Sequence, residues 1–129
     1  MPEFSGVNHV AFTVRNLETS TAFYERVFGF APVGAIDGPG LTRKLFSLPD
    51  GVTLGLTEHQ TTETGDFTPF SPGLDHLGFT VGSVDELHAW AAHLTSAGIE
   101  HSGLVEASYG TALSFTDPDG IALEFFVGR

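Results

Sequence analysis

The sequence contains two copies of one pattern, and this internal repeat constrains the fold more than any other feature. Residues 7–14 (VNHVAFTV) resemble residues 74–81 (LDHLGFTV), and residues 44–56 (KLFSLPDGVTLGL) resemble residues 113–125 (LSFTDPDGIALEF). A repeat of this length indicates two structural units that share one order of elements. Pro-Asp-Gly stands at the same place in the later pair and is typical of a turn between two strands.

Each copy is predicted to begin with a strand, because large apolar residues alternate with small or polar ones in residues 7–14 and 74–81. A helix follows in each copy, with an expected N-cap and a closing glycine (Asn16 and Gly29; Ser83 and Gly98). Shorter strands are expected after the helices, at about residues 30–36, 41–48 and 52–57 in the first copy and 99–105, 111–116 and 121–127 in the second.

The predicted fold class is therefore α+β, with two tandem βαβββ modules that form a cupped mixed sheet. Residues 1–129 are expected to form a single domain. The first module spans about residues 7–58, a polar linker about 59–73, and the second module about 74–127. One helix covers only one face of the sheet in its module, so the other face must be covered by the twin module or left as a cleft.

Composition argues against several classes of partner. The formal net charge is −11, with 5 Lys and Arg against 16 Asp and Glu, which disfavours nucleic acid and anionic membrane surfaces. No apolar run approaches the roughly 20 residues of a membrane span, and the N-terminal residues lack the layout of a secretory signal. Cysteine is absent, which excludes disulfides. We therefore expect a cytoplasmic protein that binds neither nucleic acid nor membranes.

Three ionisable residues are predicted to share the open face of the strands. Side chains alternate faces along a strand, and this alternation places His9, His76 and Glu124 opposite the bulky residues that face the helices. Two imidazoles and a carboxylate suit Fe, Mn, Co, Ni or Zn, and three protein ligands leave metal positions open for substrate. The competing interpretation is that each histidine is an ordinary hydrogen-bonded side chain. A glutamate at a strand centre is harder to explain in that way, because its burial without a partner is costly.

The segments HVAFTVRNLETSTAFYERVFGF, LDHLGFTV and FTDPDGIALEFF resemble the vicinal oxygen chelate superfamily, which includes glyoxalase I, extradiol dioxygenases and bleomycin resistance proteins. The resemblance covers about residues 7–127 and implies paired βαβββ modules around a divalent metal. The family's metal positions correspond to His9, Gly55, His76 and Glu124. Gly55 cannot bind a metal, so the resemblance implies the three-ligand set of extradiol dioxygenases and fosfomycin-modifying enzymes rather than the four-ligand set of glyoxalase I.

The resemblance implies a metal-dependent enzyme, of dioxygenase, lyase or isomerase type, that chelates two neighbouring oxygens of a small-molecule substrate. It also implies a homodimer, in which the metal ligands come from one chain or from two. The non-catalytic alternative is an antibiotic-binding protein similar to the bleomycin resistance proteins, which the acidic net charge suits. The sequence departs from the patterns of extradiol dioxygenases and of fosfomycin-modifying enzymes at one place each. Ser114 stands where extradiol enzymes carry a tyrosine, and the segment GLVEASYGT has no basic residue to bind a phosphonate.

Three further residues are catalytic or binding candidates. Arg43 is predicted to point into the cup and to bind a substrate carboxylate, although an edge arginine paired with a surface acid is an alternative. His59 has the parity of the open face and is a candidate general base, or else a solvated histidine at the start of the linker. Tyr109 is a candidate hydrogen-bond donor to a bound oxyanion, or else a loop tyrosine that packs on the sheet.

Overall fold

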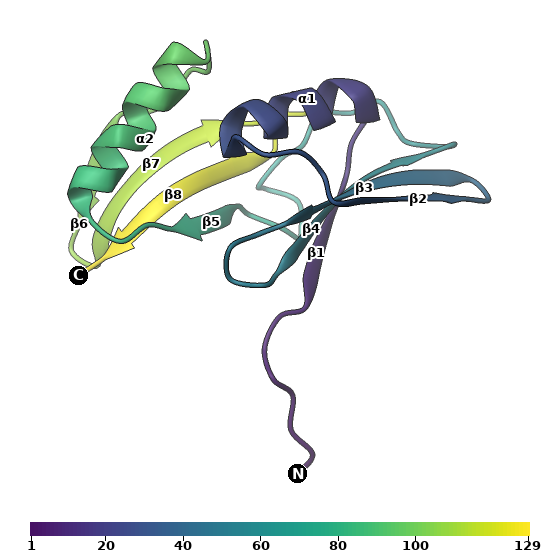
Figure 1. The fold of residues 1–129 in the computed structure, drawn as a ribbon, viewed down its shortest axis with the longest axis horizontal. Coiled ribbons are helices and arrows are strands. Elements are labelled where there is room, and N and C mark those ends of the chain that lie inside the picture. The colour runs from purple at the N-terminus through teal and green to yellow at the C-terminus, as the bar shows by residue number, and fades with distance from the viewer. The chain divides into compact units, whose positions relative to one another are not determined.

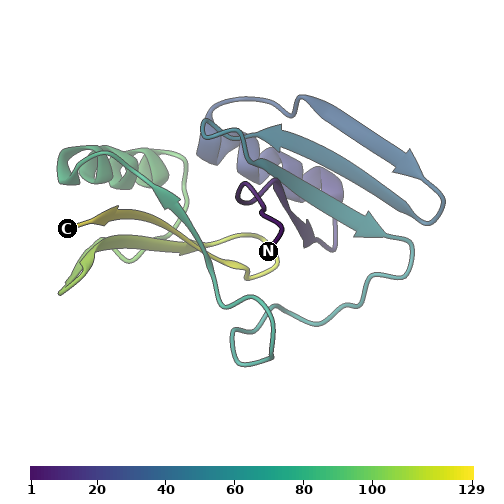
Figure 2. The same ribbon diagram turned by 90° about the horizontal axis from the view of Figure 1, so that it is seen from below.

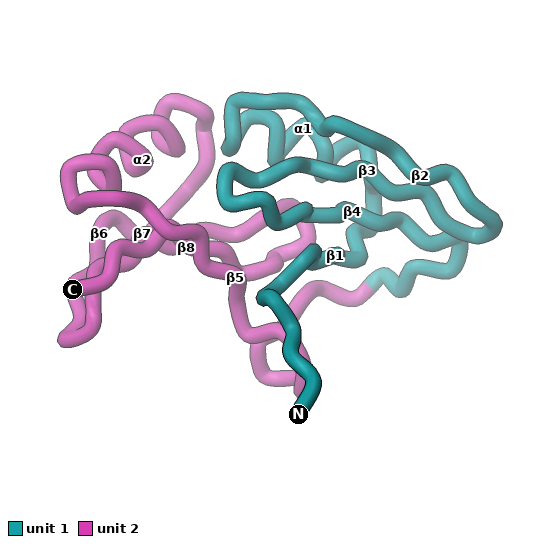
Figure 3. The backbone as a smooth tube through the Cα atoms, turned by 60° about the horizontal axis from the view of Figure 1, so that its bottom comes forward, with its two compact units in different colours: residues 1–64 teal, residues 65–129 magenta.

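The computed structural model describes residues 1–129 in two compact units, residues 1–64 and residues 65–129 (Figure 3). The first unit contains β1 (His9–Thr13), α1 (Leu17–Phe28), β2 (Gly34–Gly38), β3 (Leu41–Ser47) and β4 (Thr53–His59). The second contains β5 (Leu77–Thr80), α2 (Val84–Ser96), β6 (Leu104–Ala107), β7 (Gly110–Thr116) and β8 (Ala122–Gly128). Both units have the predicted βαβββ order, and Figures 1 and 2 show one helix along one face of each sheet.

The two sheets have the same topology. Their strand orders are β1-β4-β3-β2 and β5-β8-β7-β6, and in each the first and last strands pair in parallel while the other pairs are antiparallel. This mixed pairing brings the first strand of each unit beside its last strand. Ala11 lies opposite Gly55 in the first unit, and Gly78 lies opposite Glu124 in the second. The topology confirms the predicted duplication.

Local sequence signals account for the helix ends. Asn16 caps α1 by accepting a hydrogen bond from the Thr19 N–H (2.9 Å), and Gly29 ends the helix at a φ of 79°. At α2 the Ser83 hydroxyl accepts from the Glu86 N–H (3.1 Å). The Glu86 carboxylate accepts in return from the Gly82 N–H, one residue earlier than in the usual capping box. No helix of the structure has the length and apolar character needed to cross a membrane.

Each unit has its own apolar core between helix and sheet. In the first unit the fully buried Tyr24 contacts the rings of Phe12, Phe23, Phe28 and Phe46. In the second unit Trp90 of α2 stacks on Phe125 of β8 with ring centroids 4.0 Å apart. The buried leucines of that unit are Leu87, Leu94, Leu113 and Leu123. On the first and last strands of each unit the alternate apolar residues therefore lie under the helix. The opposite face carries His9 and Glu124, and in the first unit also Leu41 and Leu45 of β3, which share the face of Arg43.

The strand boundaries differ from the prediction at several ends. The parallel ladder of β5 with β8 begins at Leu77, so His76 directly precedes the strand rather than lying within it. In the first unit β2 starts only at Gly34, after Pro32, which has no N–H to donate to a ladder. At the other end β4 continues to His59, paired with Leu41 of β3. The alternation of faces is unaffected by these shifts.

Candidate functional site

The open face of the first sheet carries His9, as the alternation predicted. Phe12 and Val14 are buried under α1, while His9, Ala11 and Thr13 are exposed on the other face. The Nδ1–H of His9 donates to the Oδ1 of Asn8 (2.8 Å), which leaves Nε2 as the ring atom available to a ligand. The local geometry therefore suits a histidine that binds through Nε2.

The open face of the second sheet brings His76 and Glu124 together. The Nε2 of His76 lies 3.6 Å from the Oε1 of Glu124, whose side chain is about one-fifth exposed (21%). Gly78 lies directly opposite Glu124 in the parallel ladder. A Cβ atom at Gly78 would lie 3.4 Å from the Glu124 Oε1. The carboxylate therefore lies across a glycine, on the face that it shares with the imidazole.

Asp75 orients the His76 ring. The Nδ1 of His76 lies 2.6 Å from the Oδ1 of Asp75, and an ionised carboxylate only accepts hydrogen bonds, so Nδ1 carries the proton. This hydrogen bond raises the pKa of His76 above its ordinary value; partial burial lowers it, and the charges of Glu124 and Asp75 add to the increase. The Nε2 atom of the neutral ring then faces Glu124. A carboxylate on the far nitrogen is the usual support of a metal-binding histidine.

Asn8 and Asp75 are residues that the sequence analysis missed. Each immediately precedes a predicted metal-binding histidine, and each gives a side-chain oxygen to the Nδ1 of that histidine. The signal was available, because the repeats read Asn-His and Asp-His at matched positions. In this chain the oxygen-bearing residue directly before each histidine fixes the tautomer of its ring.

The three predicted metal ligands are divided between the two units. His9 belongs to the first unit, and His76 and Glu124 belong to the second. Within neither unit do three or more His, Cys, Asp or Glu side chains gather as a metal site. The second unit supplies a pair of converging ligand atoms, and the first supplies one oriented imidazole.

Arg43 lies on the open face of the first sheet, as predicted. It pairs with Thr57 in the β3–β4 ladder, and its Nε–H donates to the Thr57 Oγ1 (2.7 Å). Its stem passes over Gly55, where an added Cβ would lie 3.2 Å from the Arg43 Cδ. This cover explains why Gly55 and Thr57 are buried on an otherwise open face.

The structure also locates the other candidates, Tyr109 and His59, and the serine at position 114. Tyr109, in the turn between β6 and β7, is 72% exposed and stacks on Phe126 with ring centroids 6.0 Å apart. His59 is the last residue of β4, and its backbone, not its ring, forms the hydrogen bonds with Thr62. Ser114 lies opposite Glu124 in the β7–β8 ladder. The structure thus places Tyr109 and Ser114 in the same unit as the His76–Glu124 pair, and His59 on the strand that carries Gly55.

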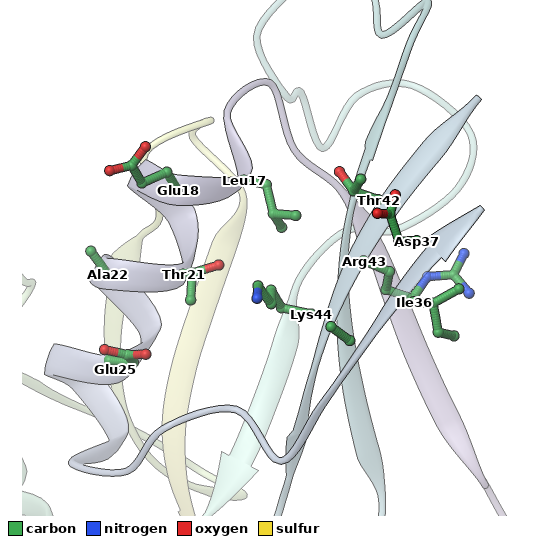
Figure 4. A pocket seen from close by; sticks show the side chains of 11 residues that line it. Leu17, Glu18, Thr21, Ala22, Glu25, Ile36, Asp37, Thr42, Arg43 and Lys44 are labelled. Atoms are coloured by element: carbon green, nitrogen blue, oxygen red, sulfur yellow. The ribbon is translucent and has the colours of Figure 1, made fainter. Parts of the chain in front are cut away.

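A pocket of about 590 Å³ lies on the helix side of the first sheet, between α1 and the β2–β3 hairpin. Its lining comprises Leu17, Glu18, Thr21, Ala22, Glu25, Ala35, Ile36, Asp37, Thr42, Arg43 and Lys44. Figure 4 shows Thr21 and Lys44 pointing into this space, while the guanidinium of Arg43 points away from it. The pocket therefore does not contain the functional end of any predicted site residue.

Comparison with known proteins identifies the family. The sequence model of the Glyoxalase/Bleomycin resistance protein/Dioxygenase superfamily matches residues 6–125. A crystal structure of a glyoxylase/bleomycin resistance protein/dioxygenase domain from Frankia sp. EAN1pec is 35% identical and superposes with a TM-score of 0.90, covering 98% of this chain and 100% of that one. The chain belongs to the glyoxalase/bleomycin resistance/dioxygenase superfamily, as the resemblance of its repeats implied.

More distant relatives differ in what their names describe. A Bacillus subtilis protein described as a candidate ring-cleaving dioxygenase, MhqA, is 29% identical over 126 residues, which are 94% of this chain and 39% of MhqA. The cadmium-induced protein CadI of Mycobacterium tuberculosis is 33% identical over 112 residues, 87% of this chain and 64% of CadI. This chain thus spans less than two thirds of either relative.

A complex of a Listeria monocytogenes FosX variant with Mn(II) and 1S,2S-dihydroxypropylphosphonic acid superposes with a TM-score of 0.73. It is 20% identical to this chain, and the match covers 98% of this chain and 93% of FosX. At this identity the likeness supports the fold.

Proposed function

We propose that this protein is a metal-dependent enzyme whose divalent ion is held by His9, His76 and Glu124. Its substrate is a small molecule that presents two neighbouring oxygens to the ion. The observation that carries the proposal is the approach of His76 Nε2 to Glu124 Oε1 at 3.6 Å, with the opposite ring nitrogen held by Asp75. Nitrogen and oxygen ligands about 2.1 Å from a shared ion lie roughly 3.0–3.4 Å apart, so the pair needs to close by only a few tenths of an ångström.

The residues fit a catalytic metal better than a structural one. Imidazole and carboxylate suit Fe, Mn, Co, Ni and Zn, and a set of three ligands leaves positions for substrate oxygens. When bound, such an ion acts as a Lewis acid that stabilises negative charge on a chelated oxygen. The chain's own contribution is to fix the tautomers of both histidines through Asn8 and Asp75, so that Nε2 is free in each.

Metal analysis of protein purified without a His tag tests the proposal. We expect stoichiometric metal in the wild type, and its loss from His76→Ala and Glu124→Gln. His88→Ala is the matched control, because His88 is exposed on α2, and it should retain the metal. Retention of metal by both site variants, with unchanged circular dichroism, would refute the ligand assignment.

We expect a homodimer, and the source of the ligands can be tested by mixing variants. His9→Ala and Glu124→Gln chains are co-expressed, and the mixed dimer is isolated with two different tags that contain no histidine. If each site uses one chain, every site in this dimer lacks a ligand. If each site combines the first unit of one chain with the second unit of the other, one of the two sites is intact. Half the wild-type metal content identifies the shared arrangement, and none identifies the single-chain one.

The second candidate function is non-catalytic binding of a cationic antibiotic, which the net charge of −11 favours. The same purified protein distinguishes the two functions. Absence of bound metal together with tight, salt-sensitive binding of a cationic drug such as bleomycin would favour this alternative. Stoichiometric metal that depends on Glu124 favours the enzyme.

A further inference from the structure

Arg43 is fixed on the open face of the first sheet by two features of its surroundings. The Thr57 hydroxyl, on a side chain that is 1% exposed, accepts a hydrogen bond of 2.7 Å from the Arg43 Nε–H. Gly55 leaves room for the stem, since a Cβ there would lie 3.2 Å from Cδ and 3.6 Å from Cγ of Arg43. A half-buried, oriented guanidinium of this kind has lost much of its side-chain freedom before any ligand arrives.

The two terminal nitrogens of Arg43 have no partner within the first unit. No carboxylate of that unit lies within ion-pair distance of them, although the chain has 16 acidic residues and only 5 Lys and Arg. An arginine held through Nε still presents its two Nη groups side by side. This fork matches the two oxygens of a carboxylate, and charge-assisted hydrogen bonds of this kind are stronger than neutral ones.

Comparison of the two repeats shows that the Arg43 stem lies where the second unit has the Glu124 carboxylate. Gly55 and Glu124 occupy equivalent places on the last strands of the two units, so the face that carries a carboxylate in the second unit carries a guanidinium stem in the first. The first strand contributes small residues beside it, with Ala11 directly opposite Gly55. The first sheet thus has a cationic group held over a glycine on its open face.

We infer that Arg43 binds an anionic oxygen group of the substrate, and that the substrate is therefore a carboxylic acid as well as a carrier of two neighbouring oxygens. Gly55 gives the arginine stem its place, because a Cβ there would push the stem outward by a few tenths of an ångström. Thr57 is the positioning residue, because it holds the Nε end and turns the Nη fork outward. This inference rests on the proposed function, since it assigns a chemical class to the ligand of the same enzyme.

Calorimetric titration of the full-length protein with two matched probes tests the inference. The probes are 3,4-dihydroxybenzoate and catechol, which share the neighbouring oxygens and differ in the carboxylate. We expect the wild type to bind the acid more tightly than catechol. Hydrogen bonds to charged groups contribute about 1.5–3 kcal/mol, so Arg43→Gln should weaken binding of the acid by roughly tenfold or more.

The controls separate this inference from the metal assignment. Arg43→Gln should leave the affinity for catechol and the metal content unchanged, and Arg43→Lys should recover part of the preference for the acid. Arg129→Gln removes an equal charge at the exposed C-terminus and should change neither affinity. Equal affinity of the wild type for both probes, failure of the acid to bind, or an unchanged preference in Arg43→Gln would overturn the role of Arg43. Loss of metal from His76→Ala bears only on the metal site.

Discussion

The pair of glycines at the end of the β7–β8 ladder provides a sharp test of the second unit. Gly110 and Gly128 lie directly opposite each other, but only Gly110 has no space for a side chain. A Cβ at Gly110 would lie 2.4 Å from the Val127 carbonyl oxygen and 2.4 Å from the Phe126 Cζ. A Cβ at Gly128 would meet only the Phe126 Cε1, at an ordinary 3.8 Å. Alanine should therefore be tolerated at one position and not at the other.

The size of the effect follows from which atoms must move. The Phe126 ring can rotate away, but the Val127 oxygen belongs to the backbone and must retreat by at least about 0.6 Å to reach the shortest contact seen for real Cβ atoms. Overpacking of this kind costs about 1–3 kcal/mol. Replacing glycine by alanine also restricts the unfolded chain, which stabilises a compatible site by about 0.4–1 kcal/mol. We expect Gly110→Ala to be about 1–3 kcal/mol less stable than Gly128→Ala.

Urea unfolding of the wild type and both variants, followed by circular dichroism, measures this difference. The Tyr109–Phe126 stack gives a second observable, because its ring-current shifts in the NMR spectrum should change in Gly110→Ala. Movement of the Phe126 ring in Gly110→Ala should also affect the surroundings of Glu124, since the two side chains share one face of β8. Equal free energies of unfolding for the two alanine variants would refute the contact on which this reasoning depends.

Three further predictions concern single side chains. Asp75→Asn should lower the pKa of His76, because the acceptor loses its charge; an imidazole NMR titration of metal-free protein measures it, and an unchanged pKa would contradict the assigned cause. Asn16→Ala should destabilise the protein by about 1 kcal/mol in urea unfolding while Asn16→Asp does not, since either Asn or Asp can cap α1. Thr57→Val should cost about 0.5–1.5 kcal/mol and accelerate exchange of the Arg43 Nε–H, and slow exchange in this variant would argue against that hydrogen bond.

The pH dependence of the His76 environment has a definite sign. Its pKa is raised in the folded protein, so the protonated ring stabilises the fold at pH values below its unfolded pKa. This contribution disappears as the pH rises through the higher folded value. The effect is small, because the side chain is about half exposed (47%). A metal must displace the same proton, so binding should weaken as the pH falls through that range.

The fold could be predicted from the repeat because each local signal had one physical interpretation. Asn16 and Ser83 mark helix starts, and Pro-Asp-Gly marks the last turn of each unit, where Gly51 and Gly120 have φ values of 88° and 81°. The exact strand ends could not be predicted in the same way. Where a ladder begins depends on which partner residues are available, as at Leu77, and a single strand's sequence does not contain that information.

The sequence predicts on which face of a strand each candidate residue lies, but not which residues its side chain contacts. Alternation placed His9, Arg43 and Glu124 on open faces without any knowledge of strand pairing. The contact of Arg43 with Gly55 and Thr57 depends on the antiparallel register of β3 and β4, which alternation alone does not fix. The hydrogen bond from His76 to Asp75 likewise depends on side-chain rotamers, and these became visible only in the folded unit.

In each unit a long charged side chain lies across a glycine, but the charge is negative in the second unit and positive in the first. In the parallel pair of each unit, one strand contributes a glycine at the level of the site, and a long side chain from a neighbouring strand crosses it. In the second unit that glycine is Gly78 of β5, and the Glu124 carboxylate lies across it from β8. In the first unit it is Gly55 of β4, and the Arg43 stem lies across it from β3. Loss of the carboxylate from the first copy is therefore coupled to the place that an arginine occupies there. Because a Cβ at Gly55 would meet that stem at 3.2 Å, restoring a carboxylate by Gly55→Glu requires the Arg43 stem to shift.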